Sequence, residues 1–110
     1  MNGNRISIPG FVIDVGSAQL LDSSGNRVQL RSQAFLVLCH LAQNAGEIVS
    51  KEDLMSAVWR NAIVTDDSLV QAIGDVRRAL GDSDHILIKT VPRRGYRMAL
   101  PDANTTQGGV

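Results

Sequence analysis

Near its C-terminal end the chain passes directly from an amphipathic helix pattern into a β-hairpin pattern, which restricts the folds open to it. In DSLVQAIGDVRRALGD the apolar side chains follow one helical stripe, at Leu69, Ile73, Val76 and Leu80. Gly81 is suited to end this helix. Two β-rich runs follow, ILIKTV (86–91) and YRMAL (96–100), joined by the turn residues PRRG. A helix and a hairpin that share one core indicate an α+β fold.

Three short strands are predicted before the helices. FVIDV (11–15), SAQLLD (17–22) and RVQL (27–30) have the composition and the polar–apolar alternation of half-buried strands. The cluster SSGN (23–26) lies between the last two and is typical of a turn. These residues therefore predict a small antiparallel meander.

Two more helices are predicted between the meander and the amphipathic helix. Apolar residues recur at helical spacing from Ser32, and this pattern stops at Gly46. Ser50 with Asp53 three residues later is close to a capping box, with Asp in place of the usual Glu or Gln. A second helix should therefore start at Ser50 and break near Asn61. The predicted order is three strands, three helices and a hairpin.

The composition is that of one soluble domain. The chain has 110 residues, of which 44% are hydrophobic and 20% charged. No apolar run approaches the roughly 18 residues that a membrane span needs, and MNGNRISIPG lacks the apolar region of a signal peptide. Cys39 is the only cysteine, so no internal disulfide can form, which fits the cytoplasm. We expect a lead-in over 1–10, a domain over 11–100 and a linker or disordered tail over 101–110.

The basic residues are concentrated although the chain has no net charge. It contains 11 Lys and Arg against 11 Asp and Glu. From His85 to Leu100, however, four basic residues occur without an acid: Lys89, Arg93, Arg94 and Arg97. A neutral total argues weakly against nucleic-acid binding, whereas a local basic cluster favours it.

The order of these segments resembles the winged helix-turn-helix DNA-binding domain of the OmpR/PhoB type over residues 10–100. VQLRSQAFLVLCHLAQNAGEIVSKEDLMSAVW is similar to the family segment that leads from a strand through helix one into helix two. DSLVQAIGDVRRALGD resembles its recognition helix, and IKTVPRRGYRM resembles its wing. The TVPRRGY form looks most like the ToxR/CadC-like branch. The resemblance implies a three- to four-stranded N-terminal antiparallel sheet, three helices and a C-terminal β-hairpin wing.

The resemblance implies that the helix over 67–80 reads bases in the major groove of double-stranded DNA. Its outward side chains are expected to be those of Asp67, Gln71, Gly74, Asp75 and Arg78, with Arg77 on a flank. Arg can pair with guanine, Gln with adenine, and Asp with the cytosine amino group. Base-contacting positions of some family members match Gly74, Asp75, Arg77, Thr90 and Pro92, of which Arg77 and Thr90 keep obvious contact chemistry.

Structural roles compete with these DNA contacts. Arg77 and Arg78 lie in the last turns of a helix, where cations interact favourably with its dipole. Asp66 and Asp67 lie at the helix start, where acids serve as caps, and this is the favoured interpretation for them. Tyr96 is interpreted as a core residue that anchors the hairpin.

The wing and the second helix supply the remaining candidates. Arg93 and Arg94 at the hairpin tip suit a narrow minor groove, where the potential is more negative. Arg97 either lies against the domain or binds phosphate. The start of the second helix, with Ser50 and Lys51, and the indole N–H of Trp59 are candidate phosphate contacts; Trp59 is equally suited to a core anchor. Lys89 and Arg60 are candidates for long-range electrostatic attraction of DNA.

The sequence shows no enzyme or metal site. Cys39 and His40 are adjacent in a helix and so point in different directions, and His85 stands alone in a loop. No Gly-rich phosphate motif follows a strand, and no cofactor is predicted. We therefore expect a sequence-specific DNA-binding domain of a transcriptional regulator. The alternative is a degenerate winged helix that acts as a protein-interaction module without binding DNA.

The resemblance also implies partners beyond DNA. Family members often bind direct repeats as head-to-tail pairs. They use the connection between helices two and three, here residues 61–66, to contact RNA polymerase. No membrane contact by this segment is expected.

Overall fold

A four-stranded antiparallel sheet begins the fold. The computed structural model describes residues 5–8, 10–60 and 64–99. The sheet has the order β1-β2-β3-β4, and each strand pairs with the next in sequence. Its strands are β1 (Arg5–Ile8), β2 (Phe11–Asp14), β3 (Gln19–Asp22) and β4 (Arg27–Val28). The predicted meander is thus confirmed, with shorter strands.

The first strand corrects the interpretation of residues 1–10 as a lead-in. Arg5–Ile8 forms β1 and pairs with β2 along its whole length, from Arg5 opposite Asp14 to Ile8 opposite Phe11. Ile8 is buried, and Ile6 packs against the core. The segment is only four residues long and Pro9 follows it, so its alternation was too brief to stand out. Residues 1–4 and 101–110 of the predicted lead-in and tail lie outside the described part of the chain.

Three helices follow, as predicted. They are α1 (Ser32–Gln43), α2 (Lys51–Val58) and α3 (Asp66–Leu80). The cap of α2 is confirmed, because the Asp53 backbone N–H donates to Ser50 Oγ at 3.0 Å. Gly81 ends α3 in the left-handed conformation, with a φ of 66°.

A second sheet was only partly predicted. It contains β6 (Ile88–Val91) and β7 (Gly95–Met98), which form the expected hairpin, and also β5 (Ile48–Ser50). The order is β5-β7-β6, so β5 lies on the open edge of β7. The three residues of β5 are too few to show a strand period, and their partner is nearly fifty residues later in the chain.

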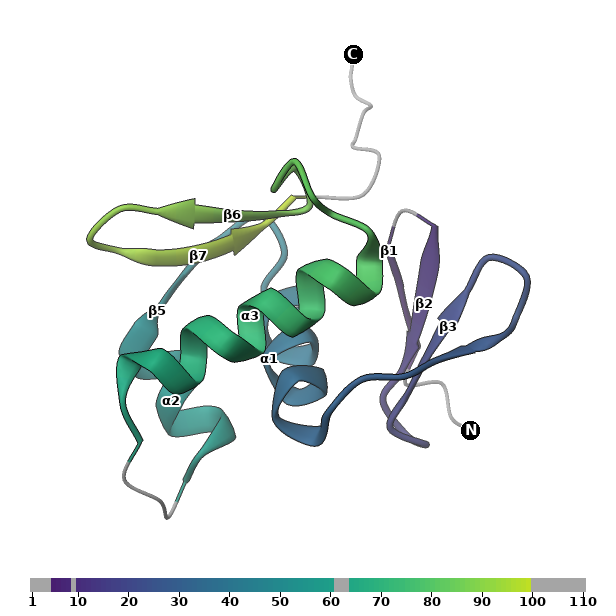
Figure 1. The fold of residues 1–110 in the computed structure, drawn as a ribbon, viewed down its shortest axis with the longest axis horizontal. Coiled ribbons are helices and arrows are strands. Elements are labelled where there is room, and N and C mark those ends of the chain that lie inside the picture. Colours follow the sequence, from purple (N-terminus) through teal and green to yellow (C-terminus); the bar gives the residue numbers. More distant parts are fainter. Residues whose placement is uncertain (1–4, 9, 61–63, 100–110) are drawn as a thin grey trace.

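The core joins both sheets to the three helices. Figure 1 shows α1 in the middle, with the N-terminal sheet on one side and the hairpin running alongside α3. The predicted stripe of α3 is buried in this core, as are Cys39 and Tyr96. The predicted α+β arrangement, with an N-terminal antiparallel sheet, three helices and a C-terminal hairpin, is therefore confirmed.

Candidate nucleic-acid interface

The outer face of α3 and the wing form one continuous surface. The wing is the β6–β7 hairpin with its turn, residues 88–98, and it runs alongside α3 (Figure 1). A groove of about 600 Å³ lies between them and is lined by residues from both, among them Val70, Gly74, Arg77, Thr90 and Tyr96. Two of the predicted contact residues, Arg77 and Thr90, are thus brought together at this groove.

Arg77 fastens the wing to α3. Its Nε and Nη2 both donate to the Ile88 carbonyl, at 3.2 and 2.7 Å, and Nη2 also donates to Thr90 Oγ1 at 3.1 Å. The guanidinium is therefore engaged by β6 before any ligand arrives. This arrangement gives Arg77 a structural role that was not considered from the sequence, where the helix dipole was the competing explanation.

Asp82 holds the loop that leads into the wing. Its carboxylate accepts from three backbone N–H groups: Oδ1 from Ile86 and Leu87 at 2.8 and 3.0 Å, and Oδ2 from Ile88 at 3.0 Å. Burial by itself would raise the pKa of Asp82. The three N–H donors and nearby Arg77 lower this pKa by more than burial raises it, so the net shift is downward. The carboxylate therefore remains charged and fixes the path from α3 to β6.

We expect Asp82→Asn to destabilise the domain by about 1–3 kcal/mol at neutral pH, because asparagine has only one acceptor oxygen and its NH2 group cannot accept the N–H of Ile88 that Oδ2 now accepts. A group with a lowered folded-state pKa stabilises the protein above its unfolded pKa, about 3.9 for Asp. That contribution is lost as pH falls through the folded-state pKa. Urea unfolding should therefore show the difference between wild type and variant shrinking below about pH 4. A difference that stayed constant down to pH 2 would contradict this assignment.

The acid in the middle of α3 is paired with arginines. Asp75 makes an ion pair with Arg78 one turn later, and its Oδ2 lies 3.8 Å from Arg31 Nε at the start of α1. The side chain of Asp75 is 18% exposed, whereas those of Arg78 and Arg31 are 76% and 80% exposed. The charge of Asp75 is therefore surrounded by cations, and this part of the face presents arginine to solvent.

The second helix brings further predicted residues to the same surface. Trp59 is half-buried at the end of α2 and lines a shallow pocket with Gln71, Asp75 and Arg31. Lys51 Nζ lies 3.7 Å from Asp66 Oδ2, which links the starts of α2 and α3. Of the two roles left open from the sequence, the structure shows that of a core anchor, because Trp59 packs against the core while remaining partly exposed.

The wing tip is a tight turn with an arginine in an unfavourable conformation. The Arg94 backbone N–H donates to the Val91 carbonyl at 3.0 Å, and Pro92 and Arg93 are the central residues. Arg93 has a φ of 67°. Proline at the second position and positive φ at the third define a type II turn, where Gly or Asn is normally preferred. Arg93 and Arg94 are both exposed.

Arg97 points away from the groove. Directly paired residues share one face of a sheet, and the pairs Ile48–Arg97 and Lys89–Arg97 place these three side chains on one face. Tyr96 and Thr90 are on the opposite face, toward α3. Arg97 therefore does not lie against the domain core, and with Lys89 it forms an exposed cationic strip on the outer side of the wing.

Sequence reasoning missed three residues of this surface. Asp82 was identifiable as an Asp directly after the helix-ending Gly81, before a loop rich in N–H donors. Arg31 gave no local signal, because its partner Asp75 is distant in sequence. Val70 was overlooked because polar side chains were sought, yet it is 56% exposed on α3.

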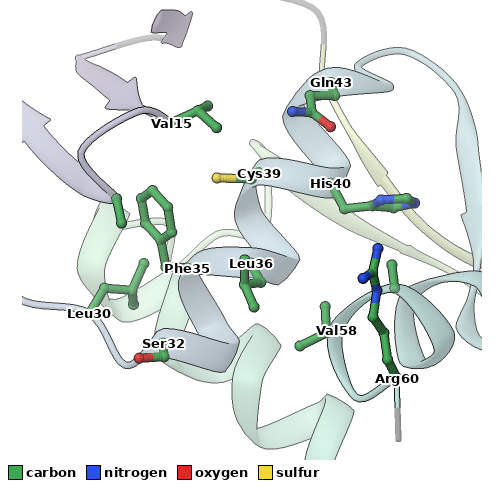
Figure 2. Close-up of a pocket in the computed structure, with 12 residues that line it drawn as sticks. Val15, Leu30, Ser32, Phe35, Leu36, Cys39, His40, Gln43, Val58 and Arg60 are labelled. Carbon is green, nitrogen blue, oxygen red and sulfur yellow. The ribbon is translucent and has the colours of Figure 1, made fainter. Parts of the chain in front are cut away.

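A second pocket lies away from this surface, between α1, α2 and the N-terminal sheet (Figure 2). It has about 470 Å³ and is lined by apolar side chains, including Phe35, Leu36 and Val58, with His40 and Arg60 at one side. The Cys39 thiol faces it (Figure 2), and burial raises the pKa of this thiol to about 11, so it is unreactive at neutral pH.

Neither a metal-binding cluster nor a membrane-spanning helix is found among the described residues. Within residues 5–8, 10–60 and 64–99, no three His, Cys, Asp or Glu side chains are grouped so that they could hold a metal ion. None of the helices in that part of the chain is long and apolar enough to cross a bilayer.

Comparison with known proteins agrees with this geometry. The family model for "Transcriptional regulatory protein, C terminal" matches residues 25–98. The chain is 33% identical over 88 residues to the transcriptional activator CadC of Escherichia coli, which covers 77% of this chain and 17% of CadC. It is 38% identical over 94 residues to the cholera toxin transcriptional activator of Vibrio cholerae, and the matched region covers 80% of this chain and 32% of that protein. The chain therefore spans only a minor part of these relatives.

Solved structures show the same fold. The DNA-binding domain of E. coli CadC aligns with a TM-score of 0.77 and 28% identity, over 92% of this chain and 96% of that one. The DNA-binding domain of Klebsiella pneumoniae RstA, solved in complex with the RstA box, aligns with a TM-score of 0.76 and 31% identity, over 88% and 98%. With the family match, these likenesses show that the chain belongs to the OmpR/PhoB-type winged helix DNA-binding domains of transcriptional regulatory proteins, with relatives in the CadC and cholera toxin activator group.

Proposed function

We propose that this domain binds double-stranded DNA sequence-specifically for a transcriptional regulator, with α3 in the major groove and the wing in the adjacent minor groove. The observation that carries the proposal is the fixed coupling of the two elements: Arg77 ties α3 to β6, while the outer face of α3 and the arginines of the wing tip remain exposed. A rigid pair of this kind can enter neighbouring grooves without reordering.

The tip supports a contact with the minor groove. Arg93 keeps a positive φ at a position where glycine would be unstrained, at a cost of about 1–2 kcal/mol. The turn itself requires a positive φ at this position, so the presence of arginine instead of glycine is what points to a contact made by this side chain. Two guanidinium groups on one short turn suit the negative potential of a narrow minor groove.

The other exposed residues fall into two groups, those that contact bases and those that contact phosphates. Gln71 and Arg78 extend from α3 and have the donor groups that read adenine and guanine in the major groove. Asp75 serves mainly to position Arg78 and Arg31. Phosphates are contacted by the Ser50 hydroxyl, Lys51 and the Trp59 indole at the ends of α2, and by Arg97 beside Lys89 on the wing.

The paired acids explain how a neutral domain can approach DNA. Asp66 and Asp75 each have a cation within ion-pair distance, and Asp82 is buried beneath the groove. The positive charges of the tip have no such partner among the ion pairs of the described residues. Local charge, rather than the total, determines the attraction to phosphate.

The proposal includes two partners besides DNA, namely a second copy of the domain and RNA polymerase. Two copies pair head to tail on direct repeats of DNA. The connection over 61–66 contacts RNA polymerase, and residues 61–63 of it lie outside the described residues. The domain acts in the cytoplasm, carries no catalytic activity and needs no cofactor. Asp82, the carboxylate at the groove, is buried and hydrogen-bonded to backbone N–H groups, which supports a structural role for it rather than an acid–base role.

Selection of bound sequences from random double-stranded DNA tests the proposal directly. We expect a short enriched site, and the logarithm of its association constant should fall linearly with the logarithm of salt concentration, by about 0.9 for each neutralised phosphate. No enrichment and no mobility shift at low salt would contradict DNA binding. That result would favour the alternative, a winged helix that serves only as a protein-interaction module.

A further inference from the structure

The exposed face of α3 carries an apolar side chain that the fold does not use. Val70 is 56% exposed, although it belongs to a helix whose apolar stripe is otherwise buried. It lines the groove between α3 and the wing, together with Gly74, Arg77 and Thr90. A valine cannot bind phosphate or form hydrogen bonds with a base edge. Its exposure on this face therefore needs another explanation.

Gly74 lies one turn after Val70 and is equally unexplained by packing. A Cβ atom built at Gly74 would meet nothing within 4 Å apart from the helix itself. Glycine in a helix interior costs about 0.5–1 kcal/mol relative to alanine, so the fold would be more stable with a side chain here. A glycine without a structural reason commonly marks a place where a ligand approaches the backbone closely.

Helical geometry places Val70 and Gly74 side by side, so that together they form a small notch on the surface of α3. At about 100° per residue, Gly74 and Arg78 fall along the middle of the outer face, and Val70 and Arg77 fall on its flank toward the wing. The hydrogen bond from Arg77 to Thr90 confirms which flank faces the wing. The notch thus has an open floor at Gly74 and an apolar wall at Val70.

We propose that Val70 and Gly74 form a contact for the 5-methyl group of a thymine in the major groove. The inference rests on the proposed DNA binding and names one base that α3 reads. Thymine is the base that presents a methyl group in this groove, whereas the other bases present donors and acceptors that valine would leave unpaired. Gly74 lets the base edge approach, and Val70 covers the methyl group.

The test replaces single thymines by uracil in the site obtained by selection, which removes one methyl group and leaves base pairing unchanged. We expect one thymine at which uracil weakens binding about fourfold, the effect of exposing one methyl-sized group. Val70→Ala should weaken binding to the thymine site by a similar factor, and it should abolish the difference between thymine and uracil. Leu36→Ala, a somewhat larger truncation of another exposed apolar side chain, 47% exposed on α1, should leave the thymine–uracil difference intact.

Gly74→Ala provides a second measurement that separates folding from recognition. We expect the melting temperature to rise by about 2–8 °C, because alanine favours the helix, while affinity for the selected site falls at least fourfold. If DNA is selected but Val70→Ala keeps the full thymine–uracil difference, or no thymine shows one, the contact is wrong and DNA binding stands. If no DNA is selected at all, the proposed function itself fails.

Discussion

Replacing Gly95 with alanine is expected to remove most of the stability of the domain, roughly 3–5 kcal/mol. Gly95 starts β7, and the added Cβ would lie 2.0 Å from the Val49 carbonyl oxygen and 2.8 Å from Ser50 Cα. These are backbone atoms of β5, so no side chain can rotate away. The φ of 149° at Gly95 adds strain for any other residue. Overpacking and backbone strain each cost about 1–3 kcal/mol, and here they act together.

Gly25→Ala is the matched control for this prediction. Gly25 also has a positive φ, 86°, but a Cβ there would meet nothing within 4 Å. Its substitution should therefore cost only the conformational strain, about 1–2 kcal/mol. Urea unfolding of both variants, followed by circular dichroism, measures the difference. Equal losses for the two variants would show that the close approach of β5 to Gly95 contributes nothing.

The close approach at Gly95 also shows what the sequence can and cannot predict. The helices and the hairpin were predictable because each depends on local signals: the stripe of α3, the Ser50 cap and the turn residues between β6 and β7. The strand β5 and its contact with Gly95 depend on register between segments that are distant in sequence. Composition around Gly95 indicates a glycine in a turn, and only the structure shows that the neighbouring strand requires it.

The candidate site divides in the same way. Exposure of Arg93 and Arg94 follows from their place in a tight turn, so the wing tip could be proposed from the sequence. The partners of Arg77 could not, because they lie on β6, eleven and thirteen residues later in the chain. The ion pair between Arg31 and Asp75 joins α1 to α3 across the fold. Helix periodicity identifies which residues face outward, but it does not identify which outward charges are already paired.

Replacing both tip arginines, Arg93→Ala with Arg94→Ala, is expected to weaken DNA binding about 5- to 150-fold at physiological salt. Each exposed arginine is expected to contribute about 0.5–1.5 kcal/mol through its contact with phosphate or with the floor of the minor groove, and two such contacts, about 1–3 kcal/mol together, correspond to that range. The loss should be similar for the selected site and for unrelated DNA, because phosphate contacts carry little sequence information. Fluorescence anisotropy at several salt concentrations measures both effects. The log–log salt slope should become shallower by about 1.8, since two phosphates are no longer neutralised.

A double variant on the N-terminal sheet separates this local contact from total charge. Arg5→Ala with Arg27→Ala changes the net charge by the same amount, but both residues lie on strands β1 and β4 rather than on the wing. Both double variants should keep cooperative melting, because all four arginines are exposed. If the two doubles weaken binding equally, attraction depends on net charge and the wing has no specific contact. If only the tip variant loses affinity and salt dependence, the arginines act where the turn places them, which is how a domain with no net charge can bind a polyanion.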